Sequence, residues 1–241
     1  MTVILNGKAS NTKPEEVIAV NGKRAIELPP VINGFAPTDI TINGYDHTPL
    51  LPSCVLYLPL WHSKLSRPSP IYSIDKYRRL CSVYGALWRP DGRYFDGVND
   101  RIASSDINFP ASNAPRTIVF WTKNLEPTGV TDGAFFWRYG TVDQRKWCAS
   151  YIAGGTTDVY FSGAADDFDT GINLDDDNWH QLIYTYDGTN ARAYKDLVEG
   201  SGSPDPRAWT TVLSGTFTIG SNGVGEYLNI VMGEFQFITK C

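Results

Sequence analysis

Hydrophobic and polar positions alternate along most of the chain after residue 50. Runs such as RTIVFWTK, residues 116–123, and WHQLIYTY, residues 179–186, are typical of β-strands. Gly, Asp, Asn and Thr separate these runs, and no long stretch shows the helical period of about 3.6 residues. About a dozen short strands at regular spacing predict an all-β fold, a two-sheet antiparallel β-sandwich or jelly roll.

The first 50 residues have a different pattern, in which an apolar residue precedes Asn-Gly four times, in ILNGK, AVNGK, VINGF and TINGY. Asn-Gly suits the type I′ turn of a two-residue hairpin loop. EVIAVNGKRAIEL, residues 16–28, therefore predicts a hairpin. The other three copies have flanking runs that are too short, or too interrupted by Pro, to predict good strands.

The chain is thus expected to have two parts, an extended N-terminal arm at 1–50 and a jelly-roll domain at 51–241. A lone hairpin is marginal in water, so the arm should dock on the main domain or on a partner. A disordered leader is the alternative, although Val, Ile and Leu are too frequent here for a typical disordered tail. The candidate docking residues are Ile18, Val20, Asn21, Gly22, Ile26, Ile32 and Ile42.

Composition excludes several classes of protein. The net charge is −5 and no basic stripe is present, so we expect no nucleic-acid partner. No apolar run approaches the roughly 20 residues of a membrane span. The N-terminus lacks the charged and apolar regions of a signal peptide, which predicts synthesis in the cytosol. The four cysteines contain no C-x-x-C pair, which argues against a structural zinc site.

An ordered set of motifs resembles laminin G-like domains of the concanavalin A-like lectin and glucanase superfamily. The set comprises FDGVNDRI, RTIVFWTK, DNWHQLIYTYDGTNARAYKD, TFTIGS and IVMGEFQFI, in that order. Each motif alone is weak, but the order is more specific, and the resemblance covers residues 52–241. It implies two antiparallel sheets packed face to face, with the first and last strands as neighbours. Cys54 and Cys241 would then lie close together, as thiols if the cytosol keeps them reduced, or as a disulfide if a particle is oxidised later.

The resemblance also implies a candidate calcium site on a rim loop. Calcium takes six to eight oxygen ligands. The candidate ligands are Asp96, Asn99 and Asp100 in FDGVND, and Asp166, Asp167, Asp169, Asp175, Asp176 and Asp177. The alternative is that FDGVND is a turn whose side chains bond their own backbone, and that the second run is a solvated loop.

The resemblance also implies carbohydrate binding, which is a common function in this superfamily. Aromatic side chains with nearby polar groups on neighbouring predicted strands could form such a surface, and the candidates are Trp137, Arg138, Tyr139, Trp147 and Tyr151. The alternative is that most of these aromatics belong to the core. We expect Trp121 and Trp179 in the core, and His180 as a structural residue at a strand entrance.

Catalysis is not favoured by the sequence. The Glu-x-Asp-x-x-Glu strand of related glucanases is missing, and the last strand, GEFQFITK, has Gln where an acid would be useful. Glycoside hydrolysis requires two carboxyl groups across the scissile bond. No G-x-S-x-G motif or suggestive Cys–His pair occurs.

These features favour a non-catalytic virion structural or decoration protein. LYLPLW and ALWRPDGRYFDGVND are similar to open reading frames in uncultured bacteriophage sequences. The arm would bind a capsid or other virion protein, and the domain would face outward, with a homo-oligomer and a cell-surface glycan as further candidate partners. The expected location is the virion, after synthesis in the host cytoplasm. A free glycan-binding lectin and, less favoured, a glycoside hydrolase are the alternatives.

Overall fold

The structure is a computed structural model. It describes residues 3–5, 8–10, 19–20, 23–24, 53–105, 108–125, 134–140, 146–152, 158–163, 166–174, 176–206, 209–213, 216–222 and 225–239. Side chains are described from residue 53 onward, except at 134, 146–152, 158–163 and 166–168. The chain divides into two compact units, Met1–Leu50 and Leu51–Cys241.

The described part of the first unit consists of two small hairpins. Strands β3 (Ala19–Val20) and β4 (Lys23–Arg24) pair with each other, as AVNGK predicts. Strands β1 (Val3–Leu5) and β2 (Lys8–Ser10) form a second hairpin around ILNGK, where the flanking runs seemed too short. Three residues of each strand are paired there. Six of the candidate docking residues lie outside the described residues: Ile18, Asn21, Gly22, Ile26, Ile32 and Ile42.

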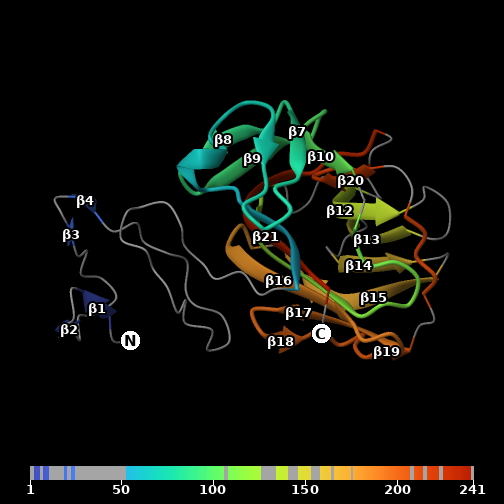
Figure 1. Cartoon of the computed structure of the whole chain (residues 1–241). Helices are drawn as coiled ribbons and strands as arrows, with labels where there is room; N and C mark the ends of the chain where they lie inside the picture. The colour runs from blue at the N-terminus through green and yellow to red at the C-terminus, as the bar shows by residue number, and fades with distance from the viewer. Residues whose placement is uncertain are drawn as a thin grey trace. The chain divides into compact units, whose positions relative to one another are not determined.

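The second unit is a sandwich of two antiparallel sheets, which confirms the predicted fold (Figure 1). The eight-stranded sheet has, in spatial order, β15 (Asp166–Asn173), β14 (Asp158–Gly163), β13 (Lys146–Ile152), β12 (Ala134–Gly140), β20 (Thr216–Ile219), β10 (Arg101–Ser105), β7 (Leu80–Tyr84) and β6 (Ile71–Tyr72). The nine-stranded sheet has β18 (Val198–Glu199), β17 (Asn190–Lys195), β16 (Trp179–Tyr186), β11 (Arg116–Asn124), β21 (Asn229–Ile238), β9 (Gly92–Asp96) and β8 (Leu87–Arg89), while β19 (Asp205–Pro206) pairs with β17 and β5 (Cys54–Pro59) with β21. In the described residues the one helical element is the 3-10 turn η1 (Ser63–Leu65), and no helix there could span a membrane.

Strand β21 lies at the centre of the nine-stranded sheet. It pairs with β11 on one side and with β9 and β5 on the other. Its inward side chains include Phe235 and Phe237, both with no exposed surface. Phe235 stacks on Phe120 at 5.9 Å and meets Phe217 of the opposite sheet at 5.4 Å. The aromatic residues that make the sequence rich in β-formers therefore join the two layers across the core.

The alternation in WHQLIYTY is reproduced in space. Leu182, Tyr184 and Tyr186 are fully buried on the core face, and His180 shares that face. The expectation for two tryptophans is wrong, because Trp121 and Trp179 are half-buried on positions that alternate with the core. The sheet pleat places odd and even positions of these strands on opposite faces.

The pairing of the first and last strands places Cys54 opposite Ile238. Cys54 is a buried free thiol, and burial raises its pKa to about 12. A thiol with so high a pKa is a poor nucleophile at neutral pH. Cys241 lies outside the described residues, so its expected approach to Cys54 stays a prediction.

The aromatic contacts of Phe235 lead to a test of the core. Phe235→Ala should lower the free energy of unfolding by about 3–5 kcal/mol, because it removes a buried ring and leaves a cavity between the sheets. Urea unfolding followed by fluorescence measures this loss. Val98→Ala, at an exposed loop position, should change stability by less than about 0.5 kcal/mol, and equal effects at both positions would contradict this description of the core.

Candidate functional site

Exposed aromatic and apolar side chains gather on the outer face of the eight-stranded sheet, near β6 and β7. In β7 the buried Cys81 and Val83 alternate with Leu80 and Tyr84, which are exposed. Tyr72 of β6 pairs directly with Leu80 and therefore shares its face. Tyr84 is 44% exposed, so a large part of its ring can contact a ligand.

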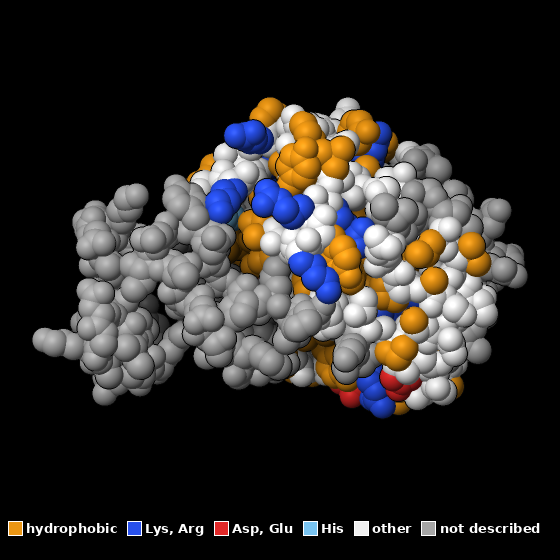
Figure 2. Space-filling view, viewed as in Figure 1, with side chains coloured by type: hydrophobic (Ala, Val, Ile, Leu, Met, Phe, Trp, Pro, Cys, Tyr) orange, Lys and Arg blue, Asp and Glu red, His pale blue; other side chains and the backbone are white. Residues whose placement is uncertain are grey.

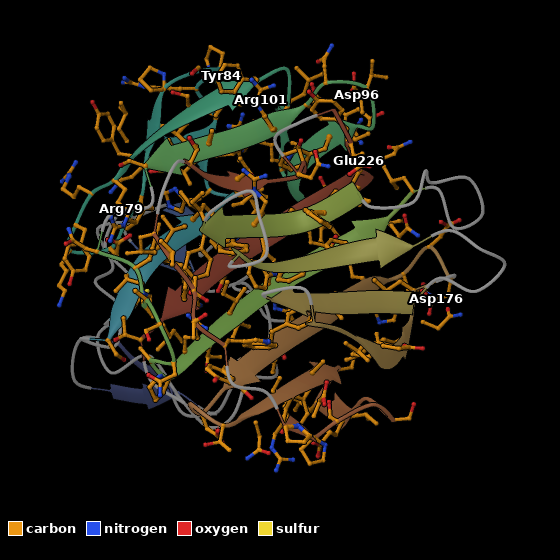
Figure 3. All side chains as sticks on the ribbon, turned by 90° about the vertical axis from the view of Figure 1, so that its right-hand side faces the viewer. Arg79, Tyr84, Asp96, Arg101, Asp176 and Glu226 are labelled. Atoms are coloured by element: carbon orange, nitrogen blue, oxygen red, sulfur yellow. The ribbon has the colours of Figure 1, made fainter. Side chains whose placement is uncertain are left out.

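Arg101 of β10 lies directly across from Tyr84 in the antiparallel register. Its guanidinium carbon is 4.0 Å from the centre of the Tyr84 ring, and Figure 3 shows the two residues together on neighbouring strands. A cation over an aromatic face is held by the ring quadrupole. Among the described residues no carboxylate forms an ion pair with Arg101, so its planar donor group can bind a ligand.

Small and polar residues continue this outer face toward the middle of the sheet. Ala103 pairs with Ser82 on one side and with Thr218 on the other, and Thr218 pairs with Arg138. Thr218 donates a hydrogen bond from Oγ1 to the Ser221 carbonyl, at 2.8 Å. Thr218 and Arg138 are largely buried, so the exposed groups of this face lie nearer its edge, on β6 and β7.

Two of the aromatics predicted to bind glycans do not reach this face. Trp137 and Tyr139 have no exposed surface and belong to the core, where Trp137 meets Tyr184 edge-on at 6.0 Å. Arg138 lies between them in sequence and on the outer face, largely buried. The expectation is therefore corrected for Trp137 and Tyr139, which are packed between the sheets and cannot stack on a ligand.

The remaining two aromatics of that prediction, Trp147 and Tyr151, have backbones in β13 and side chains outside the described residues. Tyr84 and Arg101 were missed from the sequence. The alternation in LCSVY was the available signal for Tyr84, but it cannot say which edge of which sheet the strand occupies, or that Arg101, which follows two intervening strands in the sequence, lies beside it.

The FDGVND candidates for calcium form a turn. Asp96 Oδ1 accepts the backbone N–H of Val98 at 2.8 Å and of Asn99 at 3.3 Å. Asp100 Oδ2 accepts the N–H of Asp96 at 3.0 Å, and burial raises the pKa of Asp100. These carboxylate oxygens accept hydrogen bonds from backbone N–H groups, as Asp side chains commonly do in such turns.

The second acidic run is spread along a strand and a loop. Asp169 Oδ1 accepts the N–H of Gly171 at 2.7 Å, Asp176 faces His180, and Asp177 is exposed. The side chains of Asp166 and Asp167, and the whole of Asp175, lie outside the described residues. Among the residues that the structure describes, no three acidic, His or Cys side chains form a metal-binding group.

His180 is held between two carboxylates. Its Nδ1 lies 2.6 Å from Asp196 Oδ2 and its Nε2 lies 2.7 Å from Asp176 Oδ1. Asp196 Oδ1 also accepts the N–H of Gln181, at 2.9 Å. The His180 hydrogen bond is the main cause that lowers the pKa of Asp176. This arrangement ties the loop before β16 to the end of β17, which is a structural role for His180.

The last strand presents one carboxyl group where hydrolysis would need two. Glu234 and Gln236 are two residues apart on β21, and the Gln236 amide donates to Glu234 Oε1. Burial raises the pKa of Glu234, and Tyr57 donates a long hydrogen bond to it at 3.5 Å. An amide cannot act as a general acid or as a nucleophile in glycoside hydrolysis, so this pair does not form the two-carboxylate arrangement.

Comparison with known proteins is consistent with this architecture. Residues 96–241 match the family model described as the concanavalin A-like lectin/glucanases superfamily. No curated protein matches the sequence significantly. Among solved structures, domain 4 of AbnA, a GH43 extracellular arabinanase from Geobacillus stearothermophilus in complex with arabinotriose, has a TM-score of 0.56 and 15% identity, covering 78% of this chain and 93% of that domain.

Receptor-binding domains of botulinum neurotoxins are also similar. One is a structure of the type C toxin, and cell entry of this toxin depends on interaction with two ganglioside molecules. The structure has a TM-score of 0.60 and 12% identity. The binding domain of toxin DC in complex with rat synaptotagmin II has the same values. This chain covers 48% of each of these toxin chains and 78% of its own length is matched. At such identities the likeness establishes the fold alone.

The carboxylates around His180 lead to a prediction about acid stability. A carboxyl group whose pKa is lower in the folded state stabilises the fold at pH values above its pKa in the unfolded state, which is about 3.9 for Asp. This stabilisation is lost as the pH falls through the folded-state pKa. Asp176→Asn should therefore destabilise the protein at pH 7, by less than about 1 kcal/mol because Asp176 is well exposed. The difference from the parent should shrink below about pH 4.

Chemical unfolding at pH 7 and in acid measures this difference. Asp177→Asn is the matched control, because this neighbouring loop carboxylate is not one of the two bonded to His180. A constant difference between Asp176→Asn and the parent at all pH values would contradict the charge-based explanation.

Proposed function

The chain belongs to the concanavalin A-like lectin/glucanase superfamily, and we propose that it is a non-catalytic carbohydrate-binding module. Its ligand surface is the outer face of the eight-stranded sheet around Tyr84 and Arg101. The observation that carries the proposal is the exposed Tyr84 ring braced at 4.0 Å by the Arg101 guanidinium. The arabinotriose complex of the structurally similar arabinanase domain adds support for a saccharide as the ligand.

The chemistry of this pair suits a sugar. A saccharide has an apolar face of C–H groups and a rim of hydroxyl oxygens. The exposed part of the Tyr84 ring offers apolar contact area at small cost in side-chain entropy. Arg101 offers several N–H donors in a fixed plane to ring and hydroxyl oxygens. Because Arg101 also restrains the ring, the surface is ordered before the ligand arrives, which reduces the entropy lost on binding.

The absence of catalysis is part of the proposal. Glu234 has Gln236 and Tyr57 as its polar neighbours, and Tyr84 and Arg101 lie on the other sheet. Binding through an aromatic–arginine surface needs neither a general acid nor a nucleophile. A glycoside hydrolase, the less favoured alternative, would release reducing sugar from the bound saccharide.

A second candidate role is display of the module on a virion. The separation of the chain into units Met1–Leu50 and Leu51–Cys241 supports this role, together with the repeated Asn-Gly hairpins of the first unit. The first unit would attach the protein to a capsid or other virion protein, and many copies on one particle would gain avidity even when each glycan contact is weak.

Loss of the Tyr84 ring should weaken saccharide binding. A glycan array with the parent protein identifies the ligand, and titration calorimetry then compares variants. Tyr84→Ala and Arg101→Ala should each lower affinity at least about tenfold, which corresponds to about 1.4 kcal/mol. Tyr77→Ala is the matched control, because Tyr77 is also an exposed tyrosine but lies in the turn between β6 and β7. Unchanged affinity in Tyr84→Ala, with the fold intact, would rule out this surface.

Removal of residues 1–50 should separate attachment from saccharide binding. The truncated protein is expected to keep its sandwich and its saccharide affinity, since Tyr84 and Arg101 belong to the second unit. It should no longer associate with particles in a co-sedimentation assay with virions. Retained co-sedimentation would contradict the role given to the first unit, and lost saccharide affinity would contradict the independence of the two units.

A further inference from the structure

Charge is distributed unevenly between the two ends of the sandwich. Residues 53–105 contain eight Lys and Arg against four Asp and Glu, a net charge of +4. Residues 158–206 contain two Lys and Arg against eleven Asp and Glu, a net charge of −9. The first segment supplies β6, β7, β8, β9 and β10, and the second supplies β14 to β19. In both sheets these two groups of strands lie at opposite edges.

The exposed apolar side chains follow the same division. Most of the large exposed hydrophobic residues in the described part of the chain belong to one of these two ends. Leu87 on β8 is 61% exposed and Val198 on β18 is 70% exposed. Figure 2 shows exposed hydrophobic side chains with Lys and Arg around them at the end that holds β7 to β10, and acidic side chains beside Lys or Arg at the opposite end. Each end therefore combines apolar contact area with a net charge of one sign.

Strands β8 and β18 are the two terminal strands of the nine-stranded sheet (Figure 1). In the described part of the chain, no hydrogen bond is formed by the backbone on the free side of either strand. An unpaired sheet edge is a template for a strand of another chain. The matching edge of the other sheet, β15, is already in use, since the Thr170 carbonyl accepts the N–H of Gly202 and the Asn173 carbonyl accepts Lys195 Nζ.

The charges on the two free edges lie on the same face of the sheet. Arg89 of β8 packs its guanidinium 4.0 Å over Tyr94, and Tyr94 alternates with the core residue Phe95 on β9. Glu199 of β18 pairs across from Tyr194, which alternates with the core residue Ala193 on β17. Both charges are therefore on the outer face, and the described residues contain no carboxylate paired with Arg89.

We propose that copies of this protein associate head to tail, with β8 of one copy adding to β18 of the next. The nine-stranded sheet then continues from copy to copy, and a continuous sheet keeps one face outward. Arg89 of one copy would meet Glu199 of its neighbour on the outer face of the continuous sheet. Glu199 already pairs with Arg192 at 2.6 Å, so the neighbour's Arg89 would be a second cation on the same carboxylate. The contact is heterologous, so it produces a ring or an open chain of copies.

The short edges make the contact weak and dependent on charge. Strand β8 has three residues and β18 has two, so few backbone hydrogen bonds can form across the contact. Complementary charges then supply much of the attraction and orient the encounter. The contact does not use Tyr84 or Arg101, so it is independent of the saccharide-binding proposal.

Sedimentation velocity of the full chain tests the proposal. The parent should associate with rising concentration at about 0.01 M salt and be monomeric at about 1 M salt, where the Debye length falls from about 30 to about 3 Å. Arg89→Glu and Glu199→Arg should each be monomeric under the low-salt conditions, because like charges then face each other. Lys76→Glu is the control for net charge, since it lies on the turn between β6 and β7 and should still associate.

Charge exchange gives the sharpest result. An equimolar mixture of Arg89→Glu and Glu199→Arg should associate again, and so should the double variant, because opposite charges meet once more. A parent that is monomeric at every concentration would overturn the proposal, and so would association that survives both single changes. Loss of association in Arg89→Glu but not in Glu199→Arg would show that the basic edge meets a different acidic surface of the neighbouring copy, and would also overturn it.

Discussion

The pairing of β21 with its neighbours at the centre of the nine-stranded sheet is the constraint on which the rest of the structure depends. The last strand pairs with β11, β9 and the first strand of the domain, β5. Its inward phenylalanines meet rings of the opposite sheet. Once this strand is in place, the order of the others follows, with β8 and β6 at one end of the sandwich and β18 and β15 at the other.

That order decides which aromatic residues can meet a ligand. Trp137 and Tyr139 are packed between the sheets, where Trp137 meets Tyr184 edge-on. Tyr84 points outward near an edge and is braced by Arg101. Aromatic content alone does not distinguish these cases. The burial of each ring is set by strand position and by the pleat, and both are properties of the assembled sheets.

The sequence predicted the fold well for a physical reason. Alternation with period two and frequent turn residues are local signals, and they hold for β11, β16 and the β3–β4 hairpin. The candidate site was harder to predict. In FFWRY the register shifts between Phe135 and Trp137, so that Phe136 and Trp137 are both buried in the core. A bulge of this kind shifts the alternation by one residue, and no local sequence pattern predicts it. The same holds for FDGVND, where only the folded turn shows that its carboxylates bind backbone N–H groups.

The central claim is that a saccharide binds on the outer face of the eight-stranded sheet without being cleaved. A crystal structure of the protein soaked with its best array ligand tests this claim most directly. The account predicts an intact saccharide with one sugar ring against the exposed part of Tyr84 and an oxygen within hydrogen-bonding distance of Arg101. A saccharide bound on the nine-stranded sheet beside Glu234, or cleaved in the crystal, would contradict it.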